Sequence, residues 1–163
     1  MKVLGIAGYS GSGKTTLVVR LIPELRRRGY SVSTVKHTHH NVAIDRGDAA
    51  CRALREAGAA EVLIATDHYW ALMHEHRDAP EASLTELCAR MTGVDIVLVE
   101  GFKRHQHDKI EVHRPAANTP LLCRDDPHII AVAANAPLAD VDLPILDLDD
   151  VAAIADFIVG RPA

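Results

Sequence analysis

Short apolar runs alternate with longer amphipathic stretches along the chain. Unbroken or alternating apolar runs predict β-strands at residues 2–7, 31–37, 61–66, 69–74, 95–100, 109–113, 128–134 and 144–146. Apolar residues at helical spacing predict α-helices at residues 15–28, 49–57, 83–91 and 151–159. Strands that alternate with helices in this way indicate an α/β fold built on a mostly parallel central sheet.

Local features refine this picture. Only Asp67 and His68 join the strands 61–66 and 69–74, a link too short for a crossover helix. These strands should therefore form an antiparallel hairpin and make the central sheet partly mixed. Pro23 lies inside the first helix and is expected to kink or break it.

Composition limits the class of protein. A chain of 163 residues with 48% hydrophobic content fits a single domain spanning residues 1–163. A net charge of −4 argues against binding nucleic acid through bulk positive charge. The cysteines Cys51, Cys88 and Cys123 form no C-x-x-C pair and are interpreted as reduced thiols. Without a leader pattern or an apolar run of membrane-spanning length, we expect a cytoplasmic protein with no membrane partner.

A phosphate-binding motif follows the first strand and opens the first helix. Residues 8–15 fit G-x-x-x-x-G-K-[ST] at every fixed position. Such a loop aims backbone N–H groups at phosphates, and its Lys bridges the β- and γ-phosphates. The predicted nucleotide-binding residues are Gly11, Ser12, Gly13, Lys14, Thr15 and Thr16. The expected fold is thus a P-loop NTPase-like three-layer sandwich.

Mg²⁺ on a nucleotide requires oxygen ligands close to this loop. The Thr15 hydroxyl is the usual ligand within the motif. Glu100 ends the apolar strand 95–100, and parallel strands bring their carboxyl ends to the same edge of a sheet, so it is the expected carboxylate ligand. Asp45 and Asp48, on the loop after the second strand, could contribute through a metal-bound water or be surface carboxylates.

The loop after the second strand is rich in histidine. Lys36, His37, His39 and His40 could contact phosphate or substrate, form a transition-metal site, or belong to a polar surface loop. Contact with an anion is the favoured interpretation for this set, because no Cys or carboxylate stands at a ligand spacing, and Lys36 and His37 are the predicted nucleotide contacts among them. No Asn-Lys-x-Asp motif identifies the base, and Asn135, just after a strand, is the candidate for purine contact.

Several segments together resemble the MobB family, the GTP-binding adaptor proteins of molybdopterin-guanine dinucleotide biosynthesis. They are the phosphate loop with Thr16, the Val-Lys-His-x-His-His run at 35–40, the Leu-Arg-Glu-Ala-Gly-Ala run at 54–59, and the Val-Leu-Val-Glu-Gly-Phe-Lys run at 97–103. The sequence departs from the family after Asp45, where Asp48-Ala49-Ala50-Cys51 replaces the frequent Gly-Lys-Asp-Ser. Asp48 is the residue here that could replace the second Asp of the family motif.

The resemblance implies a homodimer that binds GTP with Mg²⁺ and hydrolyses it weakly at most. It also implies that the protein acts together with the guanylyltransferase MobA, and with the molybdenum insertase, when GMP is attached to molybdopterin. A small-molecule kinase that uses ATP is the alternative, since a phosphate loop, a strand-end Glu and a basic loop would also serve it. A kinase would add an acceptor pocket, a base and a lid. No Arg-rich lid is evident in the sequence.

Overall fold

The computed structural model describes residues 1–38, 49–103 and 105–162. Contacts within the chain gather into two compact units, Met1–His37 with Met91–Ala163, and Thr38–Arg90. The sequence predicts one domain over residues 1–163, and this stays a prediction, since a division into contact units does not test it. No helix among the described residues is long and apolar enough to cross a membrane.

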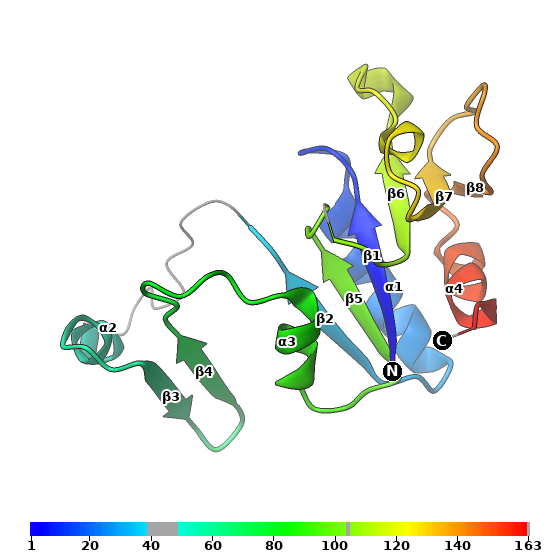
Figure 1. Cartoon of the computed structure of the whole chain (residues 1–163). Helices are drawn as coiled ribbons and strands as arrows, with labels where there is room; N and C mark the ends of the chain where they lie inside the picture. The colour runs from blue at the N-terminus through cyan, green and yellow to red at the C-terminus, as the bar shows by residue number, and fades with distance from the viewer. Residues whose placement is uncertain (39–48, 104, 163) are drawn as a thin grey trace. The chain divides into compact units, whose positions relative to one another are not determined.

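The first unit is built on a six-stranded sheet in the order β2-β5-β1-β6-β7-β8. Its strands are β1 (Lys2–Ala7), β2 (Val32–Lys36), β5 (Ile96–Glu100), β6 (Lys109–His113), β7 (Ile129–Ala134) and β8 (Ile145–Asp147). Every neighbouring pair is parallel, so the carboxyl ends of the strands lie at one edge (Figure 1). The α/β class with a mostly parallel sheet is confirmed, and each strand begins and ends within one residue of its expected position.

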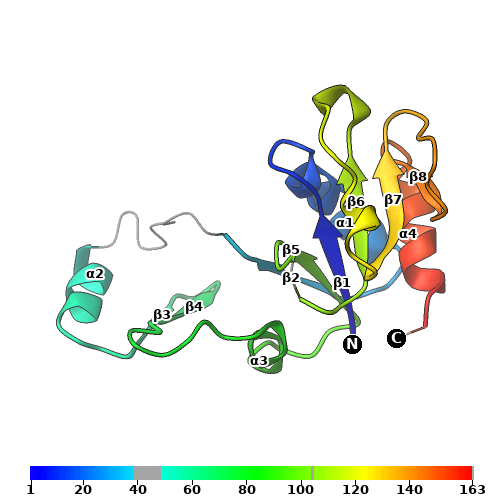
Figure 2. The ribbon, with the colours of Figure 1, turned by 45° about the horizontal axis from the view of Figure 1, so that its top comes forward.

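The helices α1 (Lys14–Arg27) and α4 (Val151–Gly160) lie on one face of this sheet (Figure 2). Their apolar stripes pack against alternate strand residues to form a single core. Its buried members include Leu4, Ile6, Leu98, Ile110 and Val112 from the strands, and Leu17, Leu21, Leu25, Ile154 and Ile158 from the helices. This core fixes the start of α1 against the end of β1.

Pro23 does not break α1, so of the kink or break expected from the sequence the break is wrong. The helix runs unbroken over 14 residues with Pro23 inside it. Val19, whose carbonyl loses its helical N–H partner, is 63% exposed, so water can reach that carbonyl. The burial of Leu21 and Leu25 on the opposite side offsets the cost of the proline, about 3 kcal/mol in a helix interior.

The central strand β6 carries buried charges on one of its faces. Lys109 and Glu111 are both 0% exposed. The Lys109 ammonium lies 3.0 Å from the Asp126 carboxylate. Glu111 accepts hydrogen bonds from the backbone N–H groups of Leu122 and Cys123, at 2.8 and 2.9 Å. These bonds tie the connection after β6, with its short helices η1 (Pro115–Ala117) and η2 (Leu122–Arg124), to the sheet.

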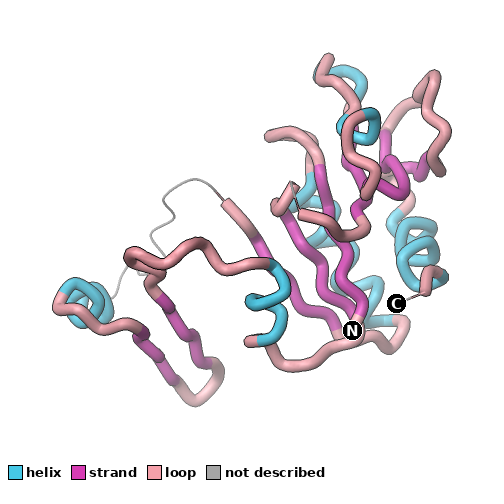
Figure 3. The backbone as a smooth tube through the Cα atoms, in the orientation of Figure 1, coloured by secondary structure: helices cyan, strands magenta, loops and turns pink. Residues whose placement is uncertain are grey.

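The second unit contains α2 (Ala49–Glu56), the strands β3 (Glu61–Ala65) and β4 (Trp70–His74), and α3 (Leu84–Ala89). The strands pair antiparallel as expected, but they form a two-stranded sheet of their own (Figure 3). The expectation that they make the central sheet mixed is therefore wrong. The turn is closed locally, because the Thr66 hydroxyl accepts hydrogen bonds from the N–H groups of His68 and Tyr69.

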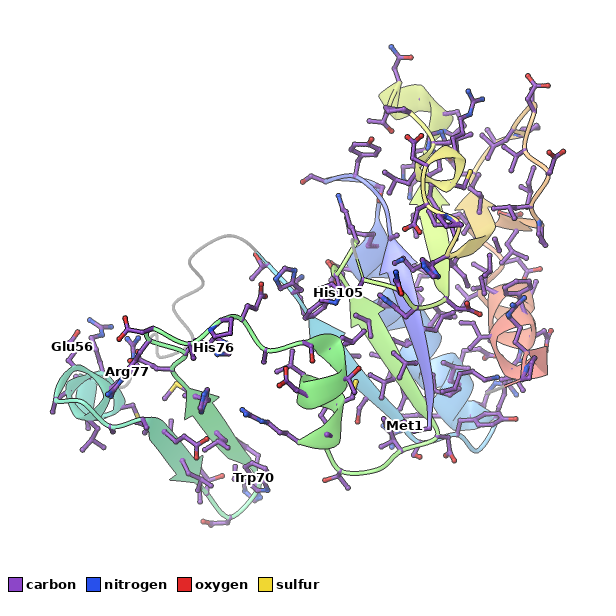
Figure 4. The ribbon with its side chains drawn as sticks, viewed as in Figure 1. Met1, Glu56, Trp70, His76, Arg77 and His105 are labelled. Carbon is purple, nitrogen blue, oxygen red and sulfur yellow. The ribbon has the colours of Figure 1, made fainter. Side chains whose placement is uncertain are left out.

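One face of this hairpin is apolar and exposed. Leu63 and Leu72 are direct cross-strand partners, 60% and 44% exposed. Trp70, at the start of β4 (Figure 4), is 63% exposed. Contiguous apolar side chains on a sheet face are typical of a surface that another protein covers.

Candidate functional site

The phosphate loop connects β1 to α1 in a conformation that depends on glycine. Gly8 and Gly13 have φ values of 144° and 101°. A Cβ on Gly8 would lie 2.6 Å from the carbonyl oxygen of Val112 in β6, so only glycine lets the chain pass this strand. Gly13 is the N-cap of α1, and its positive φ turns the chain into the helix. The first N–H groups of α1 are thereby presented at the carboxyl edge of the sheet.

Lys14 is folded back over the loop that precedes it. Its ammonium donates a hydrogen bond to the carbonyl oxygen of Tyr9 at 2.8 Å. Burial lowers the pKa of Lys14, and the nearby cations Lys103 and Lys36 lower it further, while Glu100 acts in the opposite direction. A cation held among other cations gains most from an anionic ligand, as a phosphate-binding lysine requires.

Thr15 and Glu100 are in direct contact. The Thr15 hydroxyl lies 2.8 and 2.9 Å from the two carboxylate oxygens of Glu100. The contact follows from the sheet, since β1 pairs with β5 so that Ile6 is opposite Glu100. A hydroxyl and a carboxylate side by side are the hard oxygen donors that Mg²⁺ takes, so these residues fit the expected metal site.

Lys36 joins this pair from the neighbouring strand. Its ammonium lies 3.4 Å from the Thr15 hydroxyl and 3.4 Å from the Glu100 carboxylate. β2 pairs with β5 in a register that places Lys36 opposite Glu100. The Lys36 side chain is 59% exposed, so its ammonium can move when a ligand arrives.

His37 packs on the turn that follows β5. Its ring centroid lies 4.4 Å from that of Phe102, and the Phe102 ring is 4.7 Å from that of His105, which Figure 4 labels. Phe102 is buried and has a φ of 49°. This turn brings the Lys103 ammonium to 5.3 Å from the ring centroid of Tyr9 in the phosphate loop. The ends of β2 and β5 and the phosphate loop thus form one continuous cluster.

Arg114 is a member of the site that the sequence did not reveal. It follows β6 directly, and β6 is the neighbour of β1 on the side opposite β5. Its Nε donates to the carbonyl oxygen of Ser12 at 3.0 Å. The available signal was its place just after a predicted strand, but only the strand order shows that this strand ends beside the phosphate loop.

The other predicted nucleotide-binding residues differ in how exposed they are and in how close they lie to the phosphate loop. Ser12 is buried, and within the described part of the chain its hydroxyl has no hydrogen-bond partner. Thr16 is exposed in the first turn of α1. Asn135 is exposed just beyond β7, two strands from β1.

Most of the loop after β2 lies outside the described residues. Asp45, Asp48, His39 and His40 lie outside the described residues, so their roles stay predictions. Across residues 1–38, 49–103 and 105–162, no group of three or more His, Cys, Asp or Glu side chains is arranged to hold a metal ion. Phosphate and water supply most of the ligands in Mg²⁺ sites on nucleotides, so Thr15 and Glu100 can serve such a site without a cluster of this kind.

Known proteins resemble this chain over most of its length. The sequence profile described as "Molybdopterin guanine dinucleotide synthesis protein B" matches residues 3–135. The molybdopterin-guanine dinucleotide biosynthesis adapter protein of Escherichia coli is 42% identical over 160 residues, 96% of this chain and 91% of that protein. The Haemophilus influenzae protein of the same name is 44% identical over 158 residues, 96% and 86% of the two chains. A crystal structure of a MobB protein homolog from Bacillus stearothermophilus has a TM-score of 0.70 at 25% identity, covering 99% of this chain and 100% of that one.

Proposed function

The chain belongs to the molybdopterin guanine dinucleotide synthesis protein B (MobB) family, and we propose that it acts as a GTP-binding adapter in molybdopterin-guanine dinucleotide biosynthesis. The two relatives that it matches over nearly their whole length are both described as adapters of this biosynthesis. Neither description is that of a kinase, so the alternative of an ATP-dependent small-molecule kinase finds no support.

The observation that carries the nucleotide part of this proposal is the contact between Thr15 and Glu100. It places a hydroxyl and a carboxylate together at the start of α1, beside Lys14 and Lys36. In P-loop proteins this combination holds Mg²⁺ and the phosphates of a nucleoside triphosphate. Thr15 and Glu100 would hold the metal ion here, and the ion would neutralise charge on the β- and γ-phosphates.

Lys14 would exchange its bond to Tyr9 for a phosphate. The Tyr9 carbonyl is a neutral acceptor, whereas a phosphate oxygen is charged and makes the stronger hydrogen bond to an ammonium. Gly11, Gly13 and Thr16 would contribute through the loop backbone and the first turn of α1. Guanine is the proposed base because the relatives serve a guanine dinucleotide, and Asn135 is the proposed base contact.

The described residues around Thr15 supply cations and one carboxylate, a set suited to holding a triphosphate. We therefore assign binding, with slow hydrolysis at most. We further propose that the nucleotide-bound form works in the cytoplasm with the guanylyltransferase MobA, and with the molybdenum insertase, on molybdopterin.

The homodimer is part of this proposal. The exposed apolar face of the β3–β4 hairpin, with Leu63, Trp70 and Leu72, supports it because such a face is stabilised by a second protein surface. Light scattering on the purified protein tests it directly. A monomer at micromolar concentration would contradict the dimer and leave the nucleotide site unaffected.

Calorimetric titration with GTP, GDP and ATP, each with and without Mg²⁺, tests the nucleotide proposal. We expect GTP to bind more tightly than ATP and to require Mg²⁺ for full affinity. Lys14→Ala should abolish binding while the circular dichroism spectrum is kept. Arg26→Ala, which removes an exposed cation from the far end of the same helix, is the matched control and should bind GTP normally. Tight ATP binding without a response to GTP would overturn the proposal.

A further inference from the structure

We propose that Arg114 binds nucleotide phosphate directly, as a second fixed cation of the phosphate site beside Lys14. This inference rests on the proposed nucleotide-binding function and adds a residue to it. The phosphate loop motif ends at Thr15, and Arg114 lies almost a hundred residues further along the chain. Strand β6 brings it to the loop from the side opposite Glu100.

The position of the guanidinium is defined by Gly13. In phosphate loops glycine allows a phosphate to approach the main chain closely, because no Cβ stands in the way. A Cβ placed on Gly13 would lie 3.3 Å from a terminal nitrogen of Arg114 and 3.6 Å from its Nε. The guanidinium therefore lies over the side of the loop that Gly13 leaves open.

The hydrogen bonds of Arg114 leave its terminal groups available. Its Nε donates a hydrogen bond to the Ser12 carbonyl oxygen at 3.0 Å. Within the described part of the chain, the terminal NH₂ groups of Arg114 have no hydrogen-bond partner. A guanidinium held by Nε presents its remaining N–H groups in a fixed plane, an arrangement that matches two oxygens of a phosphate.

Electrostatics also favours an anion at this place. The start of α1 carries positive partial charge, and a cation placed there is unfavourable without a counter-charge. Arg114 and Lys14 both lie at this helix end, and the carboxylate of Glu100 is already in contact with Thr15 and Lys36. A bound phosphate would supply the missing negative charge to both cations at once.

Neighbouring residues hold the end of β6 rigidly. His113 precedes Arg114 and is buried, and the buried Glu111 binds the backbone of Leu122 and Cys123. Anchored residues on both sides of Arg114 restrict where its side chain can reach. The cation is thus pre-organised against the loop before a ligand arrives, which reduces the entropy lost on binding.

The test compares Arg114→Ala and Arg114→Lys with the unchanged protein, using calorimetric titration with GTP, GDP and inorganic tripolyphosphate in the presence of Mg²⁺. Arg114→Ala should weaken all three ligands by about 10- to 100-fold, since hydrogen bonds to charged groups are worth that much. Arg114→Lys should recover part of the loss, because it keeps the charge but not the planar fork. The thermal midpoint of the ligand-free protein should fall by only a few degrees (~1 kcal/mol), since the substitution removes one hydrogen bond, to the Ser12 carbonyl.

Each alternative result has a definite meaning. Unchanged GTP affinity in Arg114→Ala would overturn the inference and leave the proposed function standing. A fall in ligand-free stability that accounts for the whole loss of affinity would make Arg114 a support of the loop and also overturn it. If the unchanged protein binds tripolyphosphate but no nucleotide, and Arg114→Ala weakens it, the proposed function fails and the inference holds. Binding of neither ligand would overturn both.

Discussion

The hydroxyl of Thr15 lies within hydrogen-bond distance of both carboxylate oxygens of Glu100, at 2.8 and 2.9 Å. These residues are 85 positions apart, and the parallel pairing of β1 with β5 brings them together. Among the described residues, the hydrogen-bond and ion-pair partners of this carboxylate are Thr15 and Lys36. Two hard oxygen donors so close together make a testable metal site.

Glu100→Gln should remove most of the effect of Mg²⁺ on GTP affinity. The amide keeps the shape of the side chain but supplies no negative charge to the ion. Titration with GTP should give similar affinities with Mg²⁺ and with EDTA, whereas the unchanged protein should bind at least about tenfold more tightly with Mg²⁺. Thr15→Ser is the matched control, since it keeps the hydroxyl. A full Mg²⁺ response in Glu100→Gln would exclude Glu100 as the ligand.

Lys36→Met should weaken GTP more than GDP. The Lys36 ammonium lies 3.4 Å from the Thr15 hydroxyl and from the Glu100 carboxylate, the groups that would hold Mg²⁺ and with it neutralise charge on the β- and γ-phosphates. A cation there can reach the γ-phosphate, which GDP lacks. We expect a loss of about 3- to 10-fold for GTP, modest because the side chain is exposed and salt screens its charge. Equal losses for GTP and GDP would contradict this placement, and Arg26→Met should leave both affinities unchanged.

The sequence was sufficient for much of the fold and for one side of the site. Periodicity and apolar runs in the sequence located every strand that the structure describes in the large sheet, because these strands are short and bounded by polar turns, and four of them, β1, β5, β6 and β7, are mostly buried. The meeting of Glu100 with the phosphate loop followed from one general rule, that parallel strands share a carboxyl edge. The rule needs no knowledge of which strands are neighbours.

The other side of the site required the strand order. β6 follows β5 in the chain, yet the two strands flank β1 on opposite sides. No local pattern encodes this order, so Arg114 could not be assigned to the phosphate loop. The burial of Lys109 and Glu111 was equally hidden, because their partners, Asp126 and the backbone at Leu122, come from a connection without regular periodicity. Alternating charged residues on a strand normally indicate an exposed face.

Asp126→Asn should destabilise the protein strongly. The Lys109 side chain is 1% exposed, and Asp126 is its carboxylate partner at 3.0 Å. Burial raises the pKa of Asp126, but the His128 N–H and the Lys109 ammonium outweigh burial and lower the pKa overall. Removal of the carboxylate leaves a buried ammonium unpaired, which costs about 3–5 kcal/mol in the free energy of unfolding. Urea denaturation at neutral pH measures this loss.

An exposed pair of the same kind provides the control. Arg20 and Asp149 approach to 3.6 Å, and both side chains are largely exposed. Asp149→Asn should therefore change the free energy of unfolding by no more than about 1 kcal/mol. Replacing both Lys109 and Asp126 with uncharged residues should recover much of the stability lost in Asp126→Asn, since no unpaired charge remains. If Asp126→Asn and Asp149→Asn lowered the free energy of unfolding equally, the buried Lys109–Asp126 pair would contribute no more to stability than an exposed pair.

The stability of the protein should fall between about pH 6.5 and pH 4 because of His107. Its ring lies against β1, where a Cβ on Gly5 would be 2.5 Å from Nε2, and among the described residues neither ring nitrogen has a hydrogen-bond partner. Burial, followed by the charge of Lys109, lowers the pKa of His107 from 6.5 to about 4. The folded state thus favours the neutral ring, and protons bind first to the unfolded chain as the pH falls.

His107→Phe should flatten this pH dependence, because phenylalanine can fill a similar space and takes up no proton. Between pH 7 and pH 4, the unchanged protein should lose on the order of 1–2 kcal/mol more unfolding free energy than the variant, an amount reduced by partial exposure of the ring. Urea denaturation at a series of pH values measures both curves. His68→Gln, which removes an exposed histidine, should follow the unchanged protein. Parallel curves for the unchanged protein and His107→Phe would mean that His107 has the same pKa in the folded and unfolded states. Its burial would then not contribute to the pH dependence of stability.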